Sequence, residues 1–141
     1  MTIAIDLGQL VTSEAKQALA LEAAKSIALD AINTKIAAER AALLTDMVGQ
    51  EMIYLAKEAE AKAWQAEINP DLADYPLLAA EVGITADDAD ALAALWLLMA
   101  DQWRKTAARL EAIRLKAKAD IAAAETLDAI ESVESGIVLP V

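Results

Sequence analysis

The chain has 141 residues and a formal net charge of −11 at pH 7, and 57% of its residues are hydrophobic although only 4% are aromatic. This acidity argues against nucleic-acid binding, which needs clustered Lys and Arg, and it is unfavourable for anionic membranes. Because the chain has no Cys and no His, it lacks disulfides, thiol chemistry and the commonest catalytic base and metal ligand.

The length is that of one domain, and much of the apolar content is Ala. Alanine favours helices and lets them approach closely while burying little area. We therefore expect thin, extended helical packing that needs a partner or further copies of the chain. The first ten residues lack a secretory pattern, and the most apolar run, 91–100, is about half the ~20 residues that span a bilayer. We expect a soluble protein made in a cytoplasm, with no membrane partner.

The N-terminal residues 1–11 are predicted to form an extended arm, because residues 2–7 alternate in polarity and include β-branched side chains. A helix is predicted at about 13–44, capped by Thr12 or Ser13. Gly49 then either breaks this helix or kinks it. A second helix is predicted at about 50–67, with an i,i+4 ion pair between Glu58 and Lys62.

Pro70 marks the clearest break in the chain. A short helix is predicted at about 76–82, with Pro76 in its first turn, Asp74 as its candidate N-cap and Gly83 as its C-cap.

A helix of about forty residues, 85–124, is the longest predicted element, with Thr85 as N-cap. Apolar residues recur along it in steps of four and three, which is typical of a left-handed packing seam. The seam consists of Leu92, Trp96, Met99, Trp103, Thr106, Leu110, Ile113, Ala117, Ile121 and Ala124. The cations that gather in its second half, such as Arg104, are expected to pair with acids on neighbouring helices.

A last helix is predicted at about 126–135, followed by an apolar, extended tail at 136–141. The two termini are therefore alike, and they either pair as short strands or dock on other subunits. The candidate docking residues are Ile3, Ile5, Leu7, Ile137, Val138 and Leu139. The fold class is all-α: a hairpin or bundle of long helices between 12 and 135, with coiled-coil-like packing and extended, β-prone ends.

No motif in the sequence is typical of a catalytic, cofactor-binding or metal-binding site. Asp87, Asp88 and Asp90 resemble the start of a calcium loop but lack its Gly and its distal Glu, and compensation of the helix dipole explains them. Tyr54 and Lys57 sit together, but no Gly-rich nucleotide-binding turn accompanies them. The sequence therefore predicts no catalytic, cofactor-binding or metal-binding residue, and no enzyme.

Three segments resemble recurrent segments of small helical proteins encoded among the tail genes of tailed bacteriophages and prophages. They are 49–61 (GQEMIYLAKEAEA), 74–85 (DYPLLAAEVGIT) and 110–124 (LEAIRLKAKADIAAA), the last preceded by Trp103. The third departs slightly from the group's aromatic and Ile-Glu-x-x-Arg order, since it begins Leu110-Glu111-Ala112-Ile113-Arg114.

This resemblance, which covers about residues 45–133, implies a structural protein of a phage tail tip, baseplate or fibre. It implies location in the virion after synthesis in the host cytoplasm, and partners among other tail and fibre proteins. A homo-oligomer is expected, with a trimer favoured. Two alternatives remain open: a tail-fibre assembly chaperone absent from the mature particle, and an unrelated soluble coiled-coil adaptor.

Overall fold

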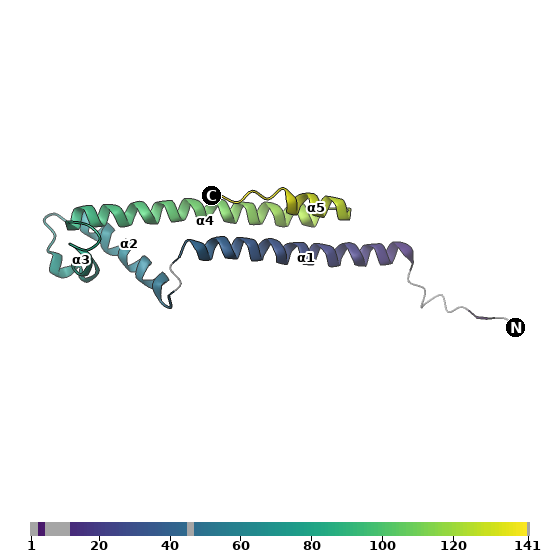
Figure 1. The fold of residues 1–141 in the computed structure, drawn as a ribbon, viewed down its shortest axis with the longest axis horizontal. Helices are drawn as coiled ribbons and strands as arrows, with labels where there is room; N and C mark the ends of the chain where they lie inside the picture. Colours follow the sequence, from purple (N-terminus) through teal and green to yellow (C-terminus); the bar gives the residue numbers. More distant parts are fainter. Residues whose placement is uncertain (1–2, 5–11, 45–46, 141) are drawn as a thin grey trace. The chain divides into compact units, whose positions relative to one another are not determined.

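The computed structural model describes residues 3–4, 12–44 and 47–140. Across these residues the chain is all-α, as predicted (Figure 1). Its helices are α1 (Ser13–Ala42), α2 (Gln50–Ala66), α3 (Pro76–Glu81), α4 (Ala89–Ala123) and α5 (Leu127–Ser135), with a 3-10 turn, η2, at Leu72–Asp74. None of the described helices is both long enough and apolar enough to cross a bilayer.

Two compact units make up the chain. Unit 1 contains residues 1–37 and 112–139, so it holds most of α1, the end of α4, and α5. Unit 2 contains residues 38–111, so it holds the last turn of α1, then α2, η2, α3 and the larger part of α4. The prediction had a single helical body at 12–135.

Unit 1 has a narrow core in which α1 lies antiparallel to the end of α4 (Figure 1). Its buried side chains are Ala28, Ile32, Ile36, Ala117, Ile121, Ala124 and Ile130. The Lys25 ammonium donates a hydrogen bond to the carbonyl of Ala122, at 3.0 Å, where α4 ends. All seven of these core residues are Ala or Ile, and the small Ala side chains let the helices lie close together.

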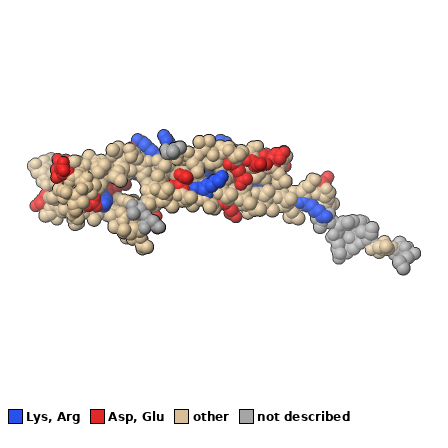
Figure 2. Space-filling view, in the orientation of Figure 1, with Lys and Arg blue, Asp and Glu red and all other residues tan. Residues whose placement is uncertain are grey.

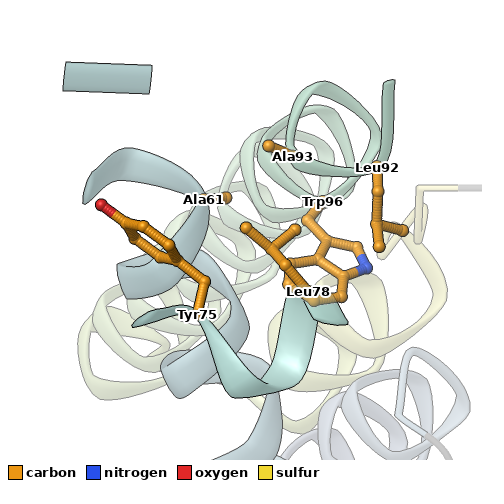
Figure 3. Packing of buried hydrophobic residues seen from close by; sticks show 6 residues of the cluster. All are labelled: Ala61, Tyr75, Leu78, Leu92, Ala93 and Trp96. Carbon is orange, nitrogen blue, oxygen red and sulfur yellow. The ribbon is translucent and has the colours of Figure 1, made fainter. Parts of the chain in front are cut away.

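Unit 2 is organised around a cluster contributed by α2, α3, α4 and the turn between η2 and α3 (Figure 3). It consists of Ala61, Tyr75, Leu78, Leu92, Ala93 and Trp96. Trp64 packs edge-on against Tyr75, with ring centroids 5.3 Å apart and planes at 82°. The small side chains of Ala61 and Ala93 leave room for Trp96 and Leu78 between the helices.

Several predicted helix ends are confirmed. Thr12 accepts a hydrogen bond from the backbone N–H of Ala15, at 3.1 Å, and Thr126 accepts one from Ala129, at 3.1 Å. The C-cap predicted at Gly83 is instead at Val82, and Gly83 follows it with a φ of 81°. The question left open at Gly49 is answered, because α1 ends at Ala42 and α2 begins directly after Gly49, whose φ is 83°. Two separate helices therefore form, and Gly49 does not merely kink one continuous helix.

The predicted start of the long helix is wrong. Helix α4 begins at Ala89, and Asp88 caps it by accepting a hydrogen bond from Ala91, at 2.7 Å. Thr85 instead belongs to a turn that folds back on α3: its N–H donates to the carbonyl of Glu81, at 3.0 Å, and its hydroxyl donates to the Glu81 carboxylate. A residue held in that turn cannot also open a helix.

The cap predicted for α3 is also wrong. Tyr75, not Asp74, occupies the N-cap position, and it makes no side-chain cap hydrogen bond. Asp74 lies in the 3-10 turn that Asp71 caps by accepting from Ala73, at 3.0 Å. The donors at the start of α3 are satisfied from a different helix, as described below.

The termini show no sheet in the described residues, where the only β-type pairing is the isolated bridge between Val82 and Ala86. Ile5 and Leu7 of the predicted docking arms lie outside the described residues, and Ile3 is exposed. Ile137 and Val138 line a groove together with Ile113 and Ala117 of α4. Leu139, the last of the six, follows them and is half-buried.

Some side chains of the predicted seam on α4 are buried and others are exposed. Leu92, Trp96, Leu110, Ala117, Ile121 and Ala124 are buried, Thr106 and Ile113 are half-buried, and Met99 and Trp103 are exposed. In unit 2 the covering helix is α2, whose Lys57 meets Trp96. This helix does not fully cover Met99 and Trp103, so both side chains remain accessible in the single chain.

Candidate interaction surface

Polar side chains on the inner side of α2 hold it to α3 and α4. Lys57 forms an ion pair with Glu81, and its ammonium lies 5.1 Å from the centroid of the Trp96 ring. The indole N–H of Trp64 donates a hydrogen bond to Asp90, at 2.7 Å. The inward side of α2 is thus unusually rich in charged groups.

Glu58 joins α2 to α4. The predicted i,i+4 pair with Lys62 is present at 2.5 Å, and Arg104 of α4 also pairs with Glu58. The hydrogen bond from Lys62 and the positive charge of Arg104 lower the pKa of Glu58 below its ordinary value, against the opposing effect of partial burial. This contact confirms the expected pairing with a neighbouring helix for Arg104, whereas Lys105 and Lys116 pair with Asp101 and Asp120 of α4 itself.

Glu60 caps α3 from α2. Its carboxylate accepts hydrogen bonds from the backbone N–H of Leu77, at 3.0 Å, and of Leu78, at 3.0 Å. The first N–H groups of a helix have no partner within the helix, and the positive end of its dipole favours a carboxylate. Sequence reasoning missed this role of Glu60, because Glu60 and Leu77 are 17 positions apart in the chain.

Tyr75 is fixed by Glu67, whose carboxylate accepts the hydrogen bond of the phenolic hydroxyl. This hydrogen bond, together with burial and the nearby negative charges of Glu67, Asp74 and Glu60, raises the pKa of Tyr75 to about 12. Ionised Tyr75 would face a carboxylate, so the folded chain keeps its proton.

A pH prediction follows from Tyr75. Because its folded pKa lies above the unfolded value of 10.0, its contribution to stability is complete below pH 10 and is lost as the pH rises toward 12. We expect titration of tyrosinate absorbance to contain a step near pH 12 that is absent from Tyr75→Phe. Tyr54 is the only other tyrosine, so the missing step is assigned unambiguously. A Tyr75→Phe difference centred near pH 10 would contradict the Glu67 contact.

The outward side of α2 is largely apolar, the reverse of the usual arrangement in a soluble helix, although Glu51, Lys62 and Gln65 are also exposed on this helix. We call this surface the outer face of α2. Its members are all exposed: Met52, Leu55, Ala56, Ala59, Ala63 and Ala66. Met52 is 75% and Leu55 is 70% exposed. In Figure 2, uncharged residues cover most of the visible surface.

The spacing of this face is that of a helix–helix seam. Positions 52, 56, 59, 63 and 66 follow in steps of four and three, which places them on one side of the helix. The repeat is present in the sequence, but its spacing alone does not show which side of α2 is exposed. Because its large side chains stand at one end and alanines follow, a second helix can approach closely along it.

The other side-chain clusters offer little chemistry. Among the described residues, no group of three or more Asp or Glu side chains is placed to hold a metal ion. Two of the three neighbouring carboxylates of the predicted helix start have separate partners. Asp88 caps α4, and Asp90 accepts a hydrogen bond from the indole N–H of Trp64. Comparison of the chain with protein-family models, with curated proteins and with solved structures found no match.

Proposed function

We propose that the protein is a structural component of a bacteriophage tail, in the tip, the baseplate or a fibre. It acts by packing the outer face of α2 against a helix of a neighbouring tail protein, and copies of the chain also associate with one another. The observation that supports this proposal is the exposed apolar seam of α2. It overlaps residues 49–61, the first segment that resembles tail-encoded proteins.

Physical reasoning favours a helical partner. An exposed apolar surface of this kind marks an interaction site. Fully burying a side chain such as Met52 or Leu55 contributes ~1.5–3 kcal/mol. The alanines that follow allow the backbones to approach closely. The charged residues that hold α2 to α3 and α4 lie on its other side, so a partner can bind without disturbing them.

Mass spectrometry of gradient-purified particles from the encoding host tests the tail assignment. We expect the chain in the particles, at a copy number that is a multiple of three or six relative to the major tail protein. Absence from particles, together with binding to fibre protein in the lysate, would overturn the structural role in favour of an assembly chaperone.

A further inference from the structure

Among the described residues of unit 1, none covers the first turns of α1. Every residue from 12 to 20 is exposed, whereas Leu21 and Ala24 are half-buried and Lys25 bonds to Ala122 at the end of α4. A short helical segment without packing is marginal in water. Leu19 and Ile27 are 68% and 69% exposed on α1. These observations call for a covering partner on the side of α1 that faces away from the core of unit 1.

That side of α1 has a symmetric pattern. Its members are Thr12, Lys16, Leu19, Ala23, Ile27, Asp30 and Thr34, all exposed. The successive steps are four, three, four, four, three and four, so the spacing is the same in both directions from Ala23. The residue types also correspond: Thr with Thr, Leu with Ile, and Lys with Asp. We call this surface the outer face of α1.

We propose that two copies of the chain pair through the outer face of α1, antiparallel and with Ala23 on the two-fold axis. The pairing places Leu19 level with Ile27 of the second copy, and Lys16 level with its Asp30. An isologous contact repeats each interaction twice, so the pair contains two Lys–Asp contacts. Ala23 is small enough for the helices to approach to the 8–10 Å of a close contact.

Charge complementarity favours a second copy as the occupant. Among the described residues, no ion pair involves the side chain of Lys16 or Asp30, whereas Lys25 pairs with Glu22. Unit 1 has nine Asp and Glu against six Lys and Arg, whereas unit 2 has fourteen against six. Pairing through unit 1 therefore joins the less repulsive parts of two acidic chains.

The pairing is distinct from the tail assignment, because it concerns the purified chain alone and closes at two copies, unlike the trimer favoured by the sequence analysis. Sedimentation equilibrium of the full chain tests it. We expect a dimer whose dissociation constant rises about tenfold in Lys16→Glu and in Asp30→Lys, since each change turns two attractive contacts into repulsive ones. The double variant K16E/D30K restores dimerisation to within about threefold.

Cysteine cross-linking tests the register, since the chain has no Cys of its own. We expect Ala23→Cys to form a disulfide-linked dimer on mild oxidation, because the two thiols meet at the axis. Ala31→Cys, also exposed on α1, is the control: its two copies lie about 24 Å apart along the axis, so it stays monomeric on non-reducing gels. A wild-type monomer, a double variant as weak as the single ones, or equal cross-linking of both cysteines would overturn the pairing. None of these results bears on whether the chain is found in phage particles.

Discussion

Replacing Leu92 by Ala is expected to lower the free energy of unfolding by about 3 kcal/mol, within the 2–5 kcal/mol typical of buried Leu-to-Ala changes. Leu92 is fully buried in the cluster that joins α4 to α2 and α3. Removing its side chain leaves a cavity beside Leu78 and Trp96, and neither can fill it without moving a helix.

Urea unfolding followed by Trp fluorescence measures this effect directly, since Trp64, Trp96 and Trp103 all belong to unit 2. The matched control is Leu98→Ala, because Leu98 is on the same helix but about half exposed. We expect the control to cost less than about 1 kcal/mol. If the two variants lost equal stability, the cluster would not be the core of unit 2.

Replacing Glu60 by Ala is expected to cost about 2 kcal/mol, because it leaves the N–H groups of Leu77 and Leu78 without their acceptor in a partly buried site. Glu60→Gln keeps one acceptor oxygen but loses the charge, so we expect roughly half that loss.

The control for Glu60 is Gln65→Ala, an exposed change on the same helix, which should alter stability by less than about 0.5 kcal/mol. The same urea unfolding experiment measures all three variants. An effect of Glu60→Ala as small as that of Gln65→Ala would mean that water replaces the carboxylate at the start of α3, so that the cap adds no stability.

Local sequence signals predicted most of the helices. Thr12 and Thr126 act within a few residues of themselves, so capping rules identify them without knowledge of the fold. The prediction at Thr85 was wrong because two good cap residues, Thr85 and Asp88, compete there. Thr85 bonds back to Glu81 in a local turn, and Asp88 accepts from Ala91 and caps α4 instead.

Long-range features were not predictable in the same way. The pairing of Glu60 with α3 depends on how the chain turns between Glu67 and Pro76, which residue spacing does not specify. Likewise, the seam spacing on α4 shows which residues share a side, but not whether another helix lies opposite each of them. Met99 and Trp103 are therefore on the seam and still exposed.

The outer face of α2 shows what periodicity leaves undecided. Both sides of this helix have a regular pattern, and the charged side chains of Lys57, Glu58 and Glu60 would ordinarily be assigned to solvent. In the folded chain their partners lie on α3 and α4, so the apolar side faces outward. Only the tertiary structure shows that this apolar side is the exposed one.

Competition for incorporation into particles tests the central claim most directly. Host cells supply wild-type chain together with the Met52→Glu and Leu55→Glu double variant, and mass spectrometry measures their ratio in purified particles. Ile84→Glu, an equally exposed apolar residue of unit 2 outside the outer face of α2, is the control. With circular dichroism and Trp fluorescence unchanged, we predict at least a roughly tenfold depletion of the double variant and normal incorporation of the control. Equal incorporation of the double variant and the control would contradict a role for the outer face of α2 in assembly.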